Sequence, residues 1–449
     1  MFNVKSLTEN HAPPGSSTAK EWIRPYYLKW FYSRIFADRY PPEFGRCWTY
    51  PGHGLDLDFQ DWITPPGERS DIVFLPAADW HLRLQRSQHL ATELVRRGHR
   101  CFYLNPHLGR EFPNPYPLSR HVVLSRLAPN VFELHVHLPR EPVYHHRPLM
   151  VPETQLVVSA LERCVNYARS VDPVIVVSLP LWTPVARMLQ SKWRYRVIYD
   201  CHDLWSGFGR FHPGILAAES DLFALSDAVC FSSASLMEAK TSAHPHTRSK
   251  PVLIRNAVRA EDFDFVYRKR ENRRKVVAYA GALDFWFDVE TVRFAAQRHP
   301  EWDFRLFGRI ESDRVRELGH LPNIQLMGEV PYSSLRQHFA SVDVCMIPFL
   351  MSPLTLATNP LKLYEYLACG LPVVSAPLPE VREFGELVYI ASKPNEFVAQ
   401  LEAAMDENSA SKAEMRRRRA EAESWASRCS LLSAHFETRT EERPTVMSC

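Results

Sequence analysis

The chain repeats one pattern twice: short apolar runs alternate with stretches at helical spacing, and a charged segment, residues 267–275, separates the two series. Continuous apolar strands that alternate with helices are typical of parallel sheets covered on both faces. The sequence therefore predicts an α/β fold with two doubly wound, Rossmann-like domains in tandem. Such pairs bind ligands in a cleft that the carboxyl ends of both sheets face, so we expect functional groups in loops that follow strands.

The expected elements fill each series at regular intervals. In the first series we expect strands at residues 71–75, 101–105, 131–136, 174–178, 197–200, 228–232 and 252–255, and helices at 87–97, 153–170 and 215–225. In the second series we expect strands at 276–280, 304–307, 324–327, 342–347, 373–376 and 388–390, and helices at 289–298, 333–340, 360–368 and 395–406.

These elements predict the domain boundaries. An N-terminal extension, residues 1–70, consists of a polar tail and an aromatic, proline-rich strap. The domains follow at 71–266 and 276–410, joined by the linker 267–275, and a C-terminal helix and tail occupy 411–449. The strap either packs over the first domain or, through the basic and aromatic residues 20–40, contacts a membrane surface or a partner.

Charge, cysteines and motifs exclude several classes of protein. A formal net charge of +3 offers no strong field for nucleic acid. The nine cysteines are scattered without a C-x-x-C pair, which is typical of reduced thiols in a cytosolic protein. The histidines lack carboxylates or cysteines at ligand spacing, so we expect no metal site. The sequence has no P-loop, G-x-G-x-x-G or G-x-S-x-G, which argues against kinases, dinucleotide dehydrogenases and α/β-hydrolases.

The chain also lacks the patterns of membrane insertion. The first residues have no apolar stretch of signal-peptide length, and no run of about 18 apolar residues occurs. We therefore expect a cytoplasmic protein, with a peripheral contact at the inner face of a membrane left open.

The strongest chemical signal follows the strand expected at 342–347. Asn359 is expected to cap a helix that begins at Pro360, whose free amides would form an anion site with Lys362. Glu365 lies on the same helix face as Lys362, and its carboxylate could accept two hydrogen bonds from a ribose diol. Gly370 would end the helix in a left-handed cap. From the residues alone, the segment is either a nucleotide diphosphate site or a capped helix with an ordinary Lys–Glu surface pair.

Two glycines after expected strands are further candidates. Gly281 and Gly308 would each let a phosphate approach the backbone closely, and Arg309 stands beside Gly308 as an additional cation. The alternative for both glycines is a tight turn that packing requires.

The segment 358–374 resembles the donor-binding motif of retaining GT-B glycosyltransferases of family four, also called glycosyltransferase group 1. The chain is similar in particular to the bacterial branch of teichuronic-acid and exopolysaccharide glycosyltransferases. The resemblance covers roughly residues 71–430, and further matching segments follow in order. They are Trp80 with 86–91, 199–203, Glu219, Asp227, Ser232, Ser233, Leu236, 281–283, 286–288, 321–324, Gly328, Asp343, 348–349 and 424–425.

The resemblance implies a metal-independent enzyme that has no cofactor and takes a nucleotide sugar as co-substrate. Its acceptor would be a glycan, a lipid-linked glycan or a small molecule. The residues implied in catalysis are His202, Lys362 and Glu365. Those implied in donor binding are Gly281, Gly308, Arg309, Asn359, Pro360, Leu361 and Tyr364, and those on the acceptor side are Trp80, Arg86, His89, Asp200 and Asp203. The two aspartates would either contact the acceptor or orient His202.

The chain departs from the family pattern at three places. The loop 281–288 lacks the Arg and Lys that many relatives use to hold the diphosphate, so neutralisation would depend on Lys362, helix amides and Arg309. The first acid of an E-x7-E pair is Ala357, and the turn N-G-V reads N-A-V at 256–258. A non-catalytic GT-B protein that binds sugar or scaffolds a complex is therefore an alternative, and a nucleotide-sugar epimerase is a third.

Overall fold

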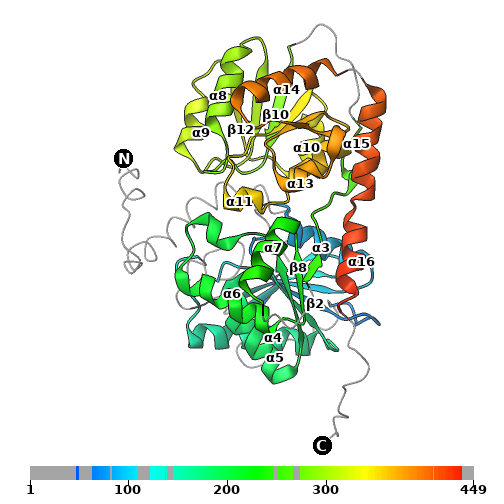
Figure 1. Cartoon of the computed structure of the whole chain (residues 1–449). Coiled ribbons are helices and arrows are strands. Elements are labelled where there is room, and N and C mark those ends of the chain that lie inside the picture. The colour runs from blue at the N-terminus through cyan, green and yellow to red at the C-terminus, as the bar shows by residue number, and fades with distance from the viewer. Residues whose placement is uncertain are drawn as a thin grey trace, which may run out of the picture. The chain divides into compact units, whose positions relative to one another are not determined.

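The computed structural model describes residues 47–49, 63–80, 83–108, 122–136, 138, 145–245, 251–265, 274–407 and 409–436 of the 449-residue chain. Its contacts divide the chain into two compact units (Figure 1). Unit 1 comprises residues 1–82, 94–199 and 208–227, and unit 2 comprises 83–93, 200–207 and 228–449. Three segments of the predicted first domain, 83–93, 200–207 and 228–265, thus group with the C-terminal half.

The first sheet has the strand order β1-β4-β5-β3-β2-β6-β7-β8-β9. Its strands are β1 (Cys47–Thr49), β2 (Ile72–Leu75), β3 (Cys101–Leu104), β4 (Val122–Ala128), β5 (Val131–Val136), β6 (Val174–Val177), β7 (Arg196–Cys201), β8 (Ala228–Phe231) and β9 (Pro251–Leu253). The sequence predicted a parallel sheet, but β4 pairs antiparallel with both β1 and β5. Asn130 makes the tight β4–β5 connection because it adopts a left-handed φ of 61°.

Three α-helices of unit 1 are α4 (Val151–Tyr167), α5 (Thr183–Trp193) and α6 (Pro213–Leu225). The helix α5 is not among the elements predicted from the sequence. Pro184 in fact lies in the first turn of α5, where its missing N–H removes no intrahelical bond. A proline near the start of an apolar stretch therefore marked a helix start and not a break.

The second sheet has the order β12-β11-β10-β13-β14-β15, and all its strand pairs are parallel. The strands are β10 (Val276–Ala280), β11 (Asp303–Phe307), β12 (Ile324–Gly328), β13 (Val344–Ile347), β14 (Val373–Ser375) and β15 (Tyr389–Ile390). The sequence predicted all six. The strand order reverses between β10 and β13, which is the arrangement of a dinucleotide-binding Rossmann sheet.

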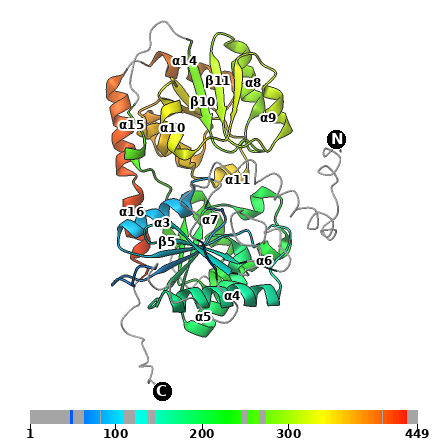
Figure 2. The same ribbon diagram turned by 180° about the vertical axis from the view of Figure 1, so that it is seen from behind.

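Helices cover both faces of this sheet, with α8 and α10 on opposite sides in Figure 2. The helices of the C-terminal half are α8 (Val289–Arg298), α9 (Asp313–Leu318), α10 (Tyr332–Phe339), α11 (Pro353–Leu356), α12 (Leu361–Ala368), α13 (Pro379–Arg382), α14 (Pro394–Asp406), α15 (Ala410–Ala422) and α16 (Trp425–Ser433). Two helices from earlier in the chain are α3 (Arg86–Arg96) and α7 (Ala234–Ala243). The predicted C-terminal helix is two helices, α15 and α16, because Ser424 interrupts it and caps α16 by accepting from the Ser427 amide.

The polar tail, most of the strap and most of the linker lie outside the described residues. The described parts of the strap are β1, which pairs with β4, and residues 63–70.

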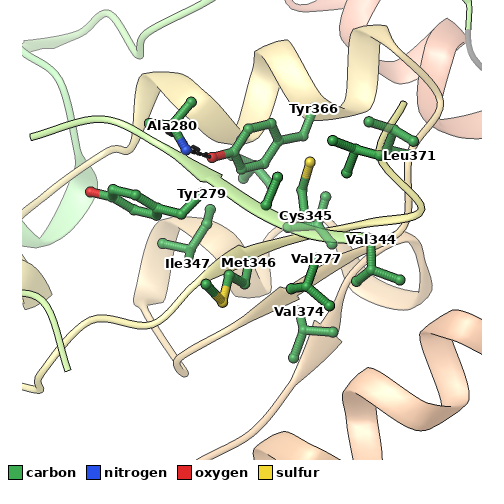
Figure 3. Close-up of a cluster of buried hydrophobic side chains, with 14 of the residues drawn as sticks. Val277, Tyr279, Ala280, Val344, Cys345, Met346, Ile347, Tyr366, Leu371 and Val374 are labelled. Atoms are coloured by element: carbon green, nitrogen blue, oxygen red, sulfur yellow. Dashed lines mark hydrogen bonds between the residues drawn. The ribbon is translucent and has the colours of Figure 1, made fainter. Parts of the chain in front are cut away.

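Apolar side chains from the central strands and from α12 form the core of the second sheet (Figure 3). One polar group in this core has a structural task. The Ala280 amide, at the end of β10, donates a hydrogen bond of 2.7 Å to the hydroxyl of the fully buried Tyr366. This bond ties the end of β10 to the middle of α12.

We expect Tyr366→Phe to lower the free energy of unfolding by about 1–3 kcal/mol, because it leaves the Ala280 amide buried without an acceptor. The matched control is Tyr389→Phe, since the Tyr389 hydroxyl donates to Glu407 at 2.7 Å and that carboxylate keeps two bonds from Arg416 when the hydroxyl is removed. Urea unfolding of both variants measures the difference. Equal losses would contradict the proposed role of Tyr366.

Candidate functional site

Two loops meet at the carboxyl edge of the second sheet, where the strand order reverses. Ligands of doubly wound sheets bind outside the carboxyl ends of the strands at such a point. The Asp288 amide donates to the Pro348 carbonyl at 2.8 Å, and the Leu350 amide donates to the Trp286 carbonyl at 2.8 Å. These bonds hold the loop after β10 beside the loop after β13, so the candidate segments share one edge of one sheet.

Two glycines form the floor of this edge. A Cβ atom on Gly308 would lie 1.8 Å from the Gly281 carbonyl oxygen, and Gly308 has a φ of +137°. A Cβ atom on Gly281 would lie 2.7 Å from Cε and 3.1 Å from Nζ of Lys362. Both positions therefore favour glycine, because the Gly281 backbone leaves no room for a Cβ atom on Gly308 and because Gly281 itself has a φ of +154°, which residues with a side chain rarely adopt. The structure thus brings Gly281, Gly308 and Lys362 together.

The Lys362 ammonium lies against aromatic rings as well as against this glycine floor. Its nitrogen is 4.7 Å from the centre of the Phe349 ring and 5.2 Å from that of Tyr279. Burial lowers the pKa of Lys362 to about 8, the charge of Arg83 acts in the same direction, and Glu365 opposes the shift. The cation is held in a partly dry site without a carboxylate in ion-pair contact among the described residues, which suits it to receive an anion.

Glu365 lies one turn further along α12, and only 9% of its surface is exposed. Burial raises the pKa of its carboxyl to about 7, and the Lys362 charge offsets part of this shift. The structure gives this carboxyl no hydrogen-bond partner within the described part of the chain. A buried carboxyl without a partner costs stability, so Glu365 has the properties of a ligand-binding group and not of an ordinary surface pair.

The predicted start of α12 was wrong in one respect. The helix begins at Leu361, Pro360 is its N-cap residue, and no side chain caps it. The side chain of Asn359 cannot act as the expected cap because it is bonded elsewhere. Its Nδ2 donates to Glu380 at 2.7 Å, and its Oδ1 accepts from the Asn256 amide at 3.2 Å. Gly370, by contrast, adopts a left-handed φ of 76° and ends α12 as predicted.

Glu380 is the residue that joins the segments around Asn359. Its buried carboxylate accepts from the Ala234 amide at 2.8 Å, from Arg255 Nε at 2.6 Å and from Asn359. Asn256 adds a second link, since its Nδ2 donates to the Asn359 carbonyl at 2.6 Å. Three stretches far apart in the sequence thereby fix the backbone that leads into α12, and we infer that they position Lys362.

Three other residues predicted to bind the donor are less well placed to contact a ligand. The Tyr364 ring is buried edge-on against Phe384, with 5.5 Å between ring centres, so packing accounts for it. Leu361 is half-buried at the first turn of α12. Arg309 lies at the correct edge, because its carbonyl accepts from the Leu283 amide at 2.9 Å, but its Nε pairs with Glu311 at 2.7 Å.

His202 lies in the loop after β7 among polar neighbours. Its Nδ1 is 3.1 Å from the Asp200 carbonyl oxygen, and its Nε2 is 3.6 Å from an Asp203 carboxylate oxygen. The Trp205 ring meets the imidazole edge-on at 5.2 Å, and the Ser232 hydroxyl donates to the His202 carbonyl at 2.8 Å. The imidazole is therefore oriented and half-buried, as a group that touches a substrate would be.

Arg86 and Asp200, both predicted to contact the acceptor, form an ion pair with each other. Arg86 Nε lies 3.0 Å from both carboxylate oxygens of Asp200, and its Nη1 donates to Asn256 Oδ1 at 3.1 Å. Arg86 is 3% exposed and Asp200 is 1% exposed. Since removing either partner would leave a buried charge, their role is structural. Asp203 remains half-buried, and burial raises the pKa of its carboxyl.

The predicted acceptor role of His89 is not supported by its position. The buried imidazole stacks on Trp425, with 4.9 Å between ring centres, and meets Tyr332 edge-on at 5.5 Å. Burial lowers the pKa of His89 to about 3, so it is a neutral packing residue at physiological pH. Trp80, in unit 1, packs edge-on against Tyr103 at 5.1 Å, and its acceptor role stays a prediction.

Sequence reasoning missed Glu380, Asn256 and Arg83 as members of this region. Asn256 was visible only as part of the N-A-V turn. Glu380 carried a weak signal, an acid in the first turn of a helix that follows a strand. Arg83 carried none, because its position depends on an ion pair with Glu329, far along the chain, and its charge affects the pKa of Lys362, which is farther still.

Solved structures of low sequence identity share this fold. A sucrose-phosphate synthase from Thermosynechococcus elongatus matches with a TM-score of 0.64 and 17% identity, over 82% of this chain and 98% of that one. The catalytic domain of starch synthase IV from Arabidopsis thaliana, bound to ADP and acarbose, matches with a TM-score of 0.62 and 11% identity over 82% and 98%. Anabaena Alr3699/HepE, in complex with UDP and glucose, matches with a TM-score of 0.57 and 16% identity over 82% and 99%. The fold is therefore that of the GT-B proteins.

The second unit can be assigned more closely. Residues 274–407 match the family model described as Glycosyl transferases group 1, so the chain carries a domain of that family. The chain is also 27% identical over 255 residues to a Bacillus subtilis (strain 168) protein described as a teichuronic acid biosynthesis glycosyltransferase, TuaH. That match covers 51% of this chain and spans 64% of the length of the relative.

The described residues contain no group of three or more His, Cys, Asp or Glu side chains that could hold a metal ion. None of the helices in those residues is long and apolar enough to cross a bilayer.

We expect Glu365→Gln to make the protein more stable at neutral and alkaline pH. The folded pKa of about 7 exceeds the ordinary value of 4.5, so ionisation costs stability as pH rises between these values, and the full cost is present above pH 7. The gain in melting temperature over wild type should thus be small near pH 4.5 and largest near pH 8. The control is Glu386→Gln, at an exposed residue, which should show no such trend. A difference in melting temperature between Glu365→Gln and wild type that does not change with pH would contradict the raised pKa of Glu365.

Proposed function

We propose that the chain is a glycosyltransferase that moves a sugar from a nucleotide-diphosphate sugar to an acceptor hydroxyl with retention at the anomeric carbon. The observation that carries this proposal is the Lys362 ammonium over the Gly281 backbone at the point where the strand order reverses, with Glu365 one turn further along α12. The ADP and UDP named for two structures of the same fold support a nucleotide at this edge.

In this proposal the diphosphate lies at the N-terminus of α12. The first amides of α12 and the Lys362 ammonium face it, and their positive charge stabilises the negative charge that grows on the leaving diphosphate. Partial burial strengthens this effect, because less water screens the ammonium. Gly281 admits the phosphate oxygens to the backbone.

Glu365 would hold the nucleoside by accepting hydrogen bonds from the two ribose hydroxyls. A carboxylate without a partner among the described residues gains two bonds when the ribose arrives, which repays part of its burial. His202 would contact the donor sugar or the leaving phosphate, with Asp203 beside its Nε2.

The acceptor would be a glycan, a lipid-linked glycan or a small molecule, and the pathway would be bacterial polysaccharide or glycoconjugate biosynthesis. The similarity to the teichuronic acid protein supports this class. We further propose that the protein works in the cytoplasm, without a cofactor.

The first test is nucleotide binding, measured as thermal shifts with UDP, GDP, ADP and dTDP, followed by calorimetry with the best of them. Lys362→Gln should weaken binding at least about tenfold, and Glu365→Gln should weaken it about a hundredfold if two charge-assisted bonds are lost. Lys412→Gln is the control, since Lys412 also lies over an aromatic ring, Tyr389, but on α15. Near-normal binding in both site variants would reject the assignment.

A non-catalytic sugar-binding protein is the second candidate, and the loop 281–288 without cations favours it. Nucleotide binding without sugar transfer to any acceptor would support that candidate. An epimerase would instead release free sugar or its epimer without an acceptor, and NMR spectroscopy of the products separates the three activities and shows whether the anomeric configuration is retained.

A peripheral membrane contact through residues 20–40 stays a prediction from sequence, because those residues lie outside the described part of the chain. If it is correct, replacing Lys20, Arg24, Lys29 and Arg34 with Gln in the full chain should release the protein from anionic vesicles in a flotation assay. Neutral vesicles serve as the control. Unchanged binding to anionic vesicles would refute the contact.

A further inference from the structure

The proposed donor site has only one cation, Lys362, that is not paired with a carboxylate among the described residues of its own sheet edge. A diphosphate group carries more than one negative charge, and its usual protein partners include several cations or helix amides. The loop 281–288 contains no Lys or Arg, and the Arg309 guanidinium pairs with Glu311 at 2.7 Å. Lys362 therefore needs a second positive group, which the local sequence does not supply.

Arg83 reaches the same edge of the sheet from a distant part of the chain. Its Nε lies 3.6 Å from a carboxylate oxygen of Glu329, the residue that directly follows β12. The Gly328 carbonyl, one residue earlier, accepts from the Gly308 amide at 2.7 Å, and Gly308 packs on Gly281. The guanidinium thus lies at the carboxyl end of β12, the strand whose last residue is bonded to Gly308.

The charge of Arg83 affects the pKa of two groups at the site, Lys362 and Tyr279. It contributes to the lowered pKa of the Lys362 ammonium. It also opposes the rise that burial causes in the pKa of the Tyr279 hydroxyl, and the Tyr279 ring lies 5.2 Å from the Lys362 nitrogen. Two like charges close enough to disfavour each other are stabilised when an anion enters between or beside them.

Buried polar contacts hold Arg83 in this place. Gln88 is fully buried, and its side-chain Nε2 donates to the Arg83 backbone carbonyl. Its side-chain Oε1 accepts from the Gln85 backbone amide at 2.9 Å. In the next turn Arg86 donates to Asn256, which donates in turn to the carbonyl of Asn359 just before α12. The segment that carries Arg83 is thereby linked to the backbone that positions Lys362.

We propose that Arg83 is the second cation of the donor site and binds the diphosphate together with Lys362, in place of the cations missing from the loop 281–288. The planar guanidinium can keep Nε toward Glu329 while its other N–H groups bind phosphate oxygens. Glu329 then acts as a positioning residue for Arg83. This inference rests on the proposed function, because it assigns a further residue to the same donor site.

The test uses calorimetric titration of the full chain with inorganic pyrophosphate and with UDP, GDP, ADP and dTDP. Arg83→Gln should weaken binding of pyrophosphate and of the preferred nucleotide about tenfold, since one charge-assisted contact is lost, and Arg83→Lys should recover part of it. The matched control is Arg293→Gln. Arg293 on α8 has a similar exposure, 29% against 32%, and its Nε also pairs with a glutamate at 3.6 Å.

The outcomes separate this inference from the proposed function. If Lys362→Gln abolishes binding while Arg83→Gln binds like wild type, the donor site stands and the role of Arg83 is overturned. If wild type binds none of the probes, or Lys362→Gln binds them normally, the donor site itself is overturned. An equal loss in Arg293→Gln would mean that general surface charge is responsible and would also overturn the assignment.

A second readout needs no ligand. Arg83→Gln should raise the pKa of Lys362 from about 8, because it removes one of the charges that lower it. The pH dependence of Lys362 acetylation, followed by mass spectrometry of the peptide, reports this pKa. An unchanged midpoint would show that Arg83 does not lie near the ammonium and would overturn the inference even if the variant folds less well.

Discussion

The close approach of two glycine backbones is the constraint on which the site depends. Gly308 lies so near the Gly281 carbonyl that a Cβ atom would be 1.8 Å from it, and Gly281 in turn leaves only enough room for the Lys362 side chain. The ends of β10 and β11 are thereby brought together under the N-terminus of α12. Because no side chain stands on this floor, an ammonium, helix amides and a ligand phosphate can share a space that larger residues would fill.

The groups above this floor are held at a cost to folding. Burial lowers the pKa of Lys362 and raises that of Glu365, so each charged form is less stable here than in water. Such strain persists where the surrounding structure fixes it, and here Glu380 and Asn256 tie the residue before α12 to segments far away in sequence. A ligand that brings negative charge to Lys362 and hydroxyls to Glu365 would relieve both groups at once.

The same long-range network explains why several polar residues are unavailable to a substrate. Arg86 and Asp200 neutralise each other in the interior, and His89 is enclosed by Trp425 and Tyr332. Because these side chains are polar, the sequence predicted that they contact an acceptor. They are buried instead, and the contacts of Arg86 and His89 pack α3 against the rest of unit 2. Arg83, three residues before Arg86, stays partly exposed, and its charge reaches the donor site.

The amino-acid sequence by itself determined the alternation of strands and helices, all six strands of the second sheet, the left-handed end of α12 at Gly370, and the gathering of Gly281, Lys362 and Glu365. These features follow from local patterns: apolar runs, helical spacing, and glycines after strands. Only the tertiary structure decided four other features: the antiparallel hairpin, the true start of α12, the pairing of Arg86 with Asp200, and the ion pair of Arg83 with Glu329. The last two depend on side chains that meet across more than a hundred residues, and all four depend on tertiary contacts, which a local sequence pattern does not contain.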